Sequence, residues 1–200
     1  MLELVLASQS PRRRELLESA GYQFRVSHVE VSENIDINLN PQANASQIAT
    51  RKAQACVSAD NSLKSRGFLV LGADTMVVLG DQILGKPQSF SEAADFLRKL
   101  SSKTHSVITG FSLIESGSTK IYVGFDETLV TFRELTENEI QEYVASGEPM
   151  DKAGAYAIQG IGRKFVTKYA GSWSNVVGLP IEKLEEALKK NGWTVHRRSP

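Results

Sequence analysis

The sequence predicts an α/β fold, because strand-like and helix-like patterns alternate along the chain. An apolar run over residues 2–7 leads directly into a helical pattern over 11–20. Hydrophobic residues make up 41% and charged residues 23% of the chain, which is the composition of an ordinary globular protein. Because no repeat, low-complexity tract or linker interrupts the sequence, a single domain over residues 1–200 is the simplest organisation.

The other elements follow from periodicity, capping signals and turn residues. Ser89-x-x-Glu92 and Thr136-x-x-Glu139 resemble capping boxes, which begin helices. In chain order, the patterns predict a half-buried strand over 24–31, a helix over 45–59, an apolar strand over 68–74 that 75–79 can extend, a hairpin arm reaching Lys86, a helix over 91–100, strands over 105–114 and 119–133, a helix over 137–145, a loop over 147–162, a strand over 165–169 and a helix over 180–190.

The charge balance and the single cysteine limit the classes of partner and compartment. Lys+Arg and Asp+Glu both number 23, so no global field attracts nucleic acid or a membrane surface. No run approaches the roughly 18 apolar residues of a membrane span. Cys56 is the only cysteine, which excludes an internal disulfide and fits a reducing compartment. We therefore expect a cytoplasmic protein with neither a nucleic-acid nor a membrane partner.

A turn rich in serine and arginine follows the first strand, with the sequence Ser8-Gln9-Ser10-Pro11-Arg12-Arg13-Arg14. Ser10 and Pro11 are typical of a helix start, where unpaired N–H groups and the dipole favour an anion. Arginines oppose the dipole at this end of a helix, so three of them favour a bound anion such as a phosphate. The plain alternative is a solvated basic turn on an ordinary helix.

Two acids are candidates for a metal or for proton transfer. Asp74 closes an apolar run, where strand ends and loops line the clefts of open α/β sheets, although a turn-capping role is equally consistent with this segment. Glu33 follows another strand-like run, and two carboxylates suit a hard cation such as Mg²⁺. The cationic candidates are scattered along the chain, and no spacing argument brings them together; they are Arg13, Lys52, Lys86 and Lys152. These patterns indicate a phosphate-handling α/β protein.

At this point the chain resembles the Maf family of nucleoside triphosphate pyrophosphatases. The matching segments occur in order through nearly the whole chain, and they are Leu6-Ala7-Ser8-x-Ser10-Pro11-Arg12-Arg13, Glu33, Lys52-Ala53, Gly72-Ala73-Asp74-Thr75, Gly85-Lys86-Pro87, Thr109-Gly110, Asp151-Lys152-Ala153-Gly154-Ala155-Tyr156, Ile158-Gln159-Gly160 and Asn175-Val176-Val177-Gly178-Leu179-Pro180. The resemblance is to the branch that hydrolyses dTTP and UTP, and it implies that Arg12, Thr75 and Gln159 determine base specificity.

The resemblance also implies a fold and a reaction. The fold is a curved mixed sheet flanked by helices, like that of the inosine triphosphate pyrophosphatases, in two lobes with a cleft between them. The reaction cleaves a nucleoside triphosphate between the α- and β-phosphates, giving a nucleoside monophosphate and pyrophosphate with a divalent cation, Mg²⁺ or Mn²⁺.

The resemblance implies the following roles for individual residues. Asp74 is the general base or acts through the metal, and Glu33 and Asp74 are the metal ligands. The substrate-binding residues are Ser8, Arg13, Lys52, Lys86, Asp151 and Lys152. Ser32 occupies a position where many members carry an acid, and Trp173 one where tyrosine is common.

Other functions remain open at this level. The chain could be a pyrophosphatase for other noncanonical nucleotides, or a nucleotide-binding regulator of septum formation with little turnover. An RNA-binding module using Arg12–Arg14 ranks last, because the chain lacks an interleaved aromatic platform. The oligomeric state is open too, with a homodimer as one option.

Overall fold

The strands belong to one mixed sheet. They are β1 (Glu3–Leu6), β2 (Phe24–Val26), β3 (Phe68–Leu79), β4 (Gln82–Leu84), β5 (Thr104–Glu115), β6 (Ile121–Phe132) and β7 (Val166–Ala170). In this computed structural model, which describes residues 1–198, the seven strands are ordered β2-β1-β3-β5-β6-β7, with β4 paired to β3. Strand β1 runs parallel to β2 and β3, whereas β3–β4 and β6–β7 are antiparallel. Residues 199 and 200 of the expected 1–200 domain lie outside the described part.

Helices separate the strands along the chain, so the predicted α/β class with a mixed sheet is confirmed. The α-helices are α1 (Pro11–Ser19), α2 (Pro41–Ala59), α3 (Phe90–Leu100), α4 (Glu137–Ala145), α5 (Trp173–Val177) and α6 (Ile181–Lys190). Short 3-10 helices complete the element order: η1 (Asn61–Lys64), η2 (Glu148–Asp151), η3 (Ala153–Ala155) and η4 (Ile161–Phe165). Among the helices of residues 1–198, none combines the length and the hydropathy needed to cross a membrane.

The chain divides into two compact units. Unit 1 comprises residues 1–74, 109–126 and 178–200, and unit 2 comprises residues 75–108 and 127–177. Strands β3, β5 and β6 each pass along the chain from one unit into the other. The single-domain organisation, the curvature of the sheet and the cleft between two lobes stay predictions.

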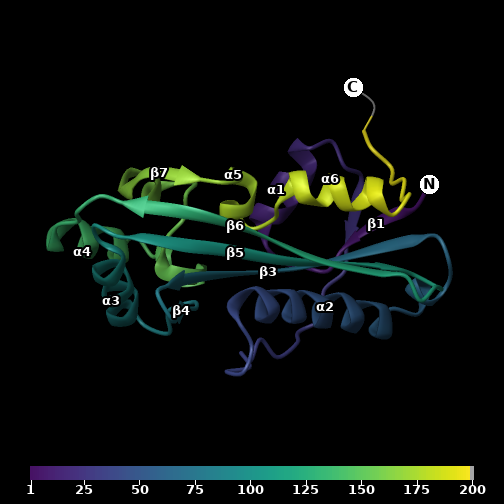
Figure 1. The fold of residues 1–200 in the computed structure, drawn as a ribbon, viewed down its shortest axis with the longest axis horizontal. Coiled ribbons are helices and arrows are strands. Elements are labelled where there is room, and N and C mark those ends of the chain that lie inside the picture. The colour runs from purple at the N-terminus through teal and green to yellow at the C-terminus, as the bar shows by residue number, and fades with distance from the viewer. Residues whose placement is uncertain (199–200) are drawn as a thin grey trace. The chain divides into compact units, whose positions relative to one another are not determined.

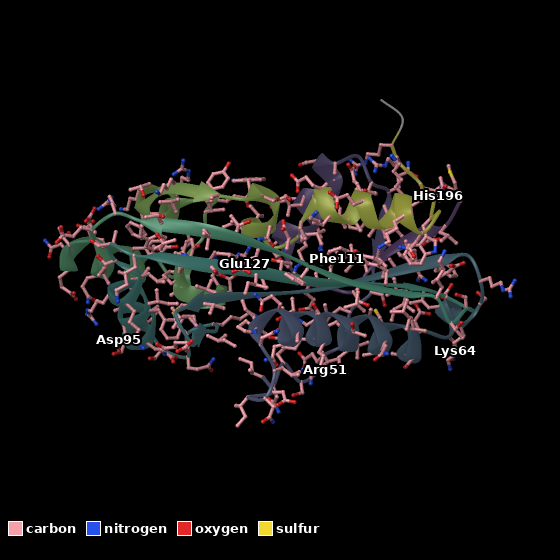
Figure 2. All side chains as sticks on the ribbon, in the orientation of Figure 1. Arg51, Lys64, Asp95, Phe111, Glu127 and His196 are labelled. Carbon is pink, nitrogen blue, oxygen red and sulfur yellow. The ribbon has the colours of Figure 1, made fainter. Side chains whose placement is uncertain are left out.

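In unit 1, α2 lies along one side of the strands, and α1 and α6 lie along the other (Figure 1). Helix α2 approaches the strands closely at two glycines. A Cβ at Gly72 would be 2.1 Å from the Ala49 carbonyl oxygen, and one at Gly110 would be 2.4 Å from the Ala45 carbonyl carbon. Because side chains alternate along a strand, Phe111 points to the opposite side, towards α6 (Figure 2).

In unit 2, an aromatic cluster fills the space beside α3 and α4. His105, Phe132 and Tyr156 are buried, and their rings meet edge to face at centroid distances of 4.7 to 5.3 Å. Tyr143 of α4 makes a similar contact with Phe165, at 5.0 Å. Such geometry is preferred by aromatic quadrupoles, so the cluster packs with a specific orientation.

Two predicted elements differ from the structure for local reasons. The strand expected over 24–31 ends at Val26, and the carbonyl of the next residue, Ser27, accepts a hydrogen bond from Cys56 Sγ of α2 at 3.1 Å. The helix expected over 45–59 begins earlier, at Pro41, because Asn40 caps it by accepting a hydrogen bond from the Ala43 N–H at 2.8 Å. The hairpin arm after β3 and both capping positions are confirmed, and Thr136 forms a complete capping box with Glu139.

The segment predicted as a loop over 147–162 is more ordered than expected. It contains η2, η3 and the start of η4, with left-handed backbone at Gly154 (φ 68°) and Ala155 (φ 57°). A positive φ at a non-glycine residue costs energy and persists only where the surroundings enforce it. This segment carries three of the predicted site residues.

Candidate active site

The turn between β1 and α1 holds one arginine in a buried position. Arg13 has 9% of its surface exposed, and its Nε donates a hydrogen bond to the Gly178 carbonyl at 2.8 Å while Nη1 donates to Ser8 Oγ at 3.0 Å. Burial lowers the pKa of Arg13, and the negative charge of Asp74 opposes that shift. Asp74 and Glu33 both act on this guanidinium, so the basic turn and the two acids share one electrostatic neighbourhood.

The three arginines of the predicted anion site therefore differ in their surroundings. Arg13 is buried, Arg12 is half-buried and Arg14 is exposed. Ser10 occupies the N-cap position of α1 but its side chain makes no capping hydrogen bond, contrary to expectation. Ser8 Oγ instead accepts a hydrogen bond from the Ser10 N–H at 3.2 Å, so the serine pair shapes the turn.

A second cluster joins two acids through one lysine. Lys52 Nζ lies 2.6 Å from Asp74 Oδ1 and 2.7 Å from Glu33 Oε1. The side chains of Lys52 and Asp74 are each 11% exposed, whereas that of Glu33 is 46% exposed. One cation thus bridges two carboxylates that are 41 residues apart in sequence, which no spacing argument predicts.

The position of Lys52 follows from the contact between α2 and β3. Gly72 lacks a side chain, so the backbone of α2 at Ala49 and Ala53 lies against β3. Lys52 belongs to the same helical turn as these alanines, and Asp74 is two residues beyond Gly72 on β3. Asp74 lies inside β3, because the predicted extension over 75–79 is confirmed: β3 continues to Leu79, and its second half pairs with β4.

Two residues that the sequence analysis missed hold the loop carrying Glu33. Asn44 is 1% exposed; its Oδ1 accepts a hydrogen bond from the Asp36 N–H at 2.8 Å, and its Nδ2 donates to the Asp36 carbonyl at 3.0 Å. Arg51 projects from α2 away from the strands (Figure 2) and donates from Nη2 to the Asn34 carbonyl at 3.0 Å. The only feature of the sequence that could have indicated this role is Asn44, a polar residue on the apolar side of a helix.

In unit 2, the structure brings the Lys86 and Lys152 segments side by side. The Gly154 N–H donates to the Gly85 carbonyl at 3.0 Å, and a Cβ at Gly154 would be 2.8 Å from the Val77 side chain. Lys152 Nζ donates to the Glu148 carbonyl at 2.7 Å and also pairs with the exposed carboxylate of Asp151. Lys86 is exposed.

The remaining specificity candidates lie on different elements. Thr75 follows Asp74 on β3 and is half-buried. Gln159 is half-buried in the connection between η3 and η4, one residue before Gly160, whose φ is 96°.

Comparison with known proteins identifies the family of this chain. The profile of Maf-like proteins matches residues 3–191. The chain belongs to the Maf family. This membership confirms the resemblance drawn from the ordered motifs.

Several curated Maf relatives carry the same name. The dTTP/UTP pyrophosphatase of Pelotomaculum thermopropionicum is 45% identical over 98% of this chain and 100% of its own length. Those of Bdellovibrio bacteriovorus and Desulfitobacterium hafniense are 46% and 49% identical, over 94% and 92% of this chain and 97% and 83% of their own lengths.

A solved structure is also similar. It is named nucleoside-triphosphatase / dITP/XTP pyrophosphatase, comes from Mycobacterium abscessus, and gives a TM-score of 0.43 at 13% identity over 95% of this chain and 94% of that chain. At that TM-score the likeness supports no conclusion, so the kinship to inosine triphosphate pyrophosphatases stays a prediction.

The donor set of this Maf protein fits a particular kind of metal binding. Within residues 1–198 no group of three or more histidines, cysteines and acids could hold a metal ion. Glu33 and Asp74 nevertheless converge on one cation, Lys52. Two carboxylates fit Mg²⁺ or Mn²⁺ when phosphate oxygens of a substrate and water complete the coordination, which is the usual arrangement in phosphate-transfer sites. They do not fit a metal cage built of protein groups alone.

Proposed function

We propose that this protein hydrolyses dTTP and UTP between the α- and β-phosphates, releasing the nucleoside monophosphate and pyrophosphate. The observation that carries the proposal is the convergence of Asp74 and Glu33 on Lys52, in the electrostatic neighbourhood of the buried Arg13. Acids and cations held together, with Asp74, Lys52 and Arg13 largely buried, suit the hydrolysis of a polyanion. The names of the Maf relatives support the same substrates.

The reaction needs one water molecule and no redox partner. The water oxygen forms a bond to the α-phosphorus as the bond from that phosphorus to the bridging oxygen breaks, and the electron pair leaves with pyrophosphate. Asp74 is the proposed general base, because its carboxylate is nearly buried and its position on β3 is fixed. It accepts the proton that the attacking water loses.

The cationic groups of unit 1 stabilise negative charge. Arg13 is held by Ser8 Oγ and the Gly178 carbonyl, so its guanidinium enters the reaction already oriented. Lys52 supplies a second fixed charge. Charges that need no reorganisation during the reaction favour a transition state in which the leaving group becomes more negative.

Glu33 and Asp74 are the residues that would hold a divalent cation together with phosphate oxygens. A bound cation supplies Lewis-acid polarisation and charge neutralisation at those oxygens. The roles of Lys86, Asp151 and Lys152 in substrate binding rest on the family resemblance. We assign base selection to Arg12, Thr75 and Gln159, since an amide can both donate to and accept from a pyrimidine edge.

The test is product release from a nucleotide panel with Mg²⁺ or Mn²⁺, using dTTP, UTP, CTP, 7-methyl-GTP, ITP and dITP. We expect selective conversion of dTTP and UTP to monophosphate and pyrophosphate. Asp74→Asn should still fold, because Lys52 keeps its ion pair with Glu33, but it should lose about 100-fold or more in turnover, because the proton acceptor is removed. Asp81→Asn, a matched change at the exposed β3–β4 turn, should retain full turnover.

Two results would contradict the proposal. Turnover of Asp74→Asn near that of the wild type would remove Asp74 from the mechanism. Tight nucleotide binding without hydrolysis under either metal would make the protein a nucleotide-binding regulator instead.

A further inference from the structure

Glu148, at the start of η2, has no role in the family motifs or in the proposed chemistry, yet its carboxylate is engaged on both oxygens. Oε1 accepts hydrogen bonds from the Tyr143 hydroxyl at 2.9 Å and from the Gly162 N–H at 3.1 Å. Oε2 accepts from the Ile161 N–H at 3.1 Å. The carboxylate therefore holds two consecutive backbone amides at the end of the loop that carries Gln159.

The partner of this carboxylate holds the other end of the same loop. The Tyr143 hydroxyl, which donates to Glu148, accepts a hydrogen bond from the Ala157 N–H at 3.3 Å. Ala157 and Ile161 bracket Gln159 by two residues on each side. Three backbone amides of the loop thus donate hydrogen bonds to one pair of side chains, Tyr143 of α4 and Glu148 of η2.

The loop fits closely around this pair. A Cβ at Gly160 would be 2.7 Å from Glu148 Oε2, and one at Gly162 would be 2.8 Å from the Tyr143 hydroxyl. Contacts below 3 Å require movement, and a Cβ at Gly162 would also be 2.7 Å from the Ala157 carbonyl oxygen, so glycine at both positions favours this close fit. Gly160 also has a φ of 96°, a conformation that favours glycine.

We propose that Glu148 is a positioning residue for base recognition: it fixes the 157–162 loop so that the Gln159 amide meets the base in one orientation. The inference rests on the proposed function, because it assumes that Gln159 reads the base. Hydrogen bonds to a charged acceptor are stronger than neutral ones, so a carboxylate at this position holds backbone amides firmly. Discrimination by hydrogen bonding requires such a fixed partner, since a mobile amide pairs with several base edges.

The same residue offers a way to separate two effects. Lys152 Nζ donates to the backbone carbonyl of Glu148 and not to its carboxylate. A change of the Glu148 side chain therefore leaves this lysine contact in place. The change should therefore weaken base recognition and leave the contribution of Lys152 to substrate binding unchanged.

Glu148→Gln is the informative variant, because it keeps the volume but replaces one acceptor oxygen by an NH₂ group that faces donors. Tyr143→Phe removes the hydroxyl and keeps the ring against Phe165. The matched control is Glu142→Gln, which removes the same charge from an exposed position on α4. Each protein is assayed for kcat and KM with UTP and CTP, and for amide hydrogen exchange by NMR.

We expect Glu148→Gln to reduce the ratio of kcat/KM for UTP over CTP by about tenfold, in line with the loss of one charged hydrogen bond. KM for UTP should rise while kcat changes by less than about twofold, and the amides of Ala157, Ile161 and Gly162 should exchange faster. Tyr143→Phe should shift the ratio in the same direction by less. Glu142→Gln should match the wild type in every measurement.

A double variant shows whether the effect passes through Gln159. We expect Gln159→Ala to lose base discrimination, so adding Glu148→Gln to it should not lower the UTP/CTP ratio further. An equal loss for UTP and CTP, or unchanged exchange of the three amides, would overturn the inference while leaving the pyrophosphatase activity intact. A wild-type protein that hydrolyses no nucleotide of the panel would overturn the proposed function, and the recognition role of Glu148 with it.

Discussion

At the scale of single residues, the candidate site is governed by charges held away from water. Lys52 and Asp74 have side chains that are only 11% exposed, and Lys52 also meets Glu33. Removing one partner of a nearly buried ion pair leaves an uncompensated charge, so losing one charge costs more stability than the pair itself contributes. The three charges thus constrain one another's positions before any substrate binds.

Another buried polar residue, His105, lies in the aromatic cluster of unit 2. His105 is 2% exposed, and its Nε2 is 2.8 Å from the Tyr156 hydroxyl. Burial lowers the pKa of His105 to about 4. Tyr156 begins the segment that leads to Gln159, so His105 helps to hold that segment in place.

The lowered pKa predicts how stability depends on pH. The unfolded chain binds a proton at His105 below a pKa of 6.5, whereas the folded chain resists it until about 4. The free energy of unfolding should therefore fall as the pH drops through that window, by about 2 kcal/mol between pH 7 and pH 5. Urea unfolding at pH 7 and pH 5 measures this change in the free energy of unfolding.

The comparison variant is His105→Gln, which keeps a polar side chain but does not titrate. It should lose about 2 kcal/mol less than the wild type between pH 7 and pH 5. His196→Gln, a change at an exposed histidine, should behave as the wild type. Equal pH-dependent losses in the wild type and His105→Gln would contradict the assignment.

At the scale of elements, the contact between α2 and β3 brings Lys52 and Asp74 together. At Gly72 the two backbones approach so closely that a Cβ would be 2.1 Å from the Ala49 carbonyl oxygen and 3.0 Å from the Ala53 nitrogen. Both neighbours are backbone atoms of a helix, which cannot rotate aside. The closeness of α2 to β3 is thus set by the glycine.

Gly72→Ala should therefore destabilise the protein by about 3 kcal/mol or more, since overpacking against backbone cannot be relieved by a rotamer change. Any surviving folded protein should also lose turnover, because moving α2 separates Lys52 from Asp74. Gly85→Ala is the control, since a Cβ there meets nothing within 4 Å. Urea unfolding and the UTP assay check both effects, and a Gly72→Ala protein as stable as Gly85→Ala would refute the argument.

At the scale of the whole molecule, three strands pass through both units. The boundaries after Asp74, Ile108 and Asp126 fall inside β3, β5 and β6. Unfolding one unit alone would have to stop in the middle of three hydrogen-bonded strands. We therefore expect the two units to unfold in one cooperative transition.

The two tryptophans make this expectation measurable, because Trp173 lies in unit 2 and Trp193 in unit 1. In Trp193→Phe the remaining fluorescence reports on unit 2, and in Trp173→Phe it reports on unit 1. Within each variant, the urea midpoints from fluorescence and from far-UV circular dichroism should coincide. Separate midpoints would show that the units unfold independently.

Local signals in the sequence were enough to predict most elements. Capping residues and apolar periodicity located α3, α4 and β5 to within a residue or two. The β3–β4 hairpin was predicted from its glycine turn. The strand expected to reach residue 31 ends at Val26 instead, and the Ser27 carbonyl after it accepts a hydrogen bond from Cys56 of α2, a residue distant in sequence.

The sequence by itself determined the class of fold, the identity of the charged groups and the family, because these depend on residue types in a fixed order. Only the tertiary structure decided which groups meet. Lys52 bridges Glu33 and Asp74, and Glu148 holds the loop of Gln159, through contacts across 13 to 22 residues of sequence. Such contacts depend on how helices and strands pack, and the separation of two residues along the chain does not determine that packing.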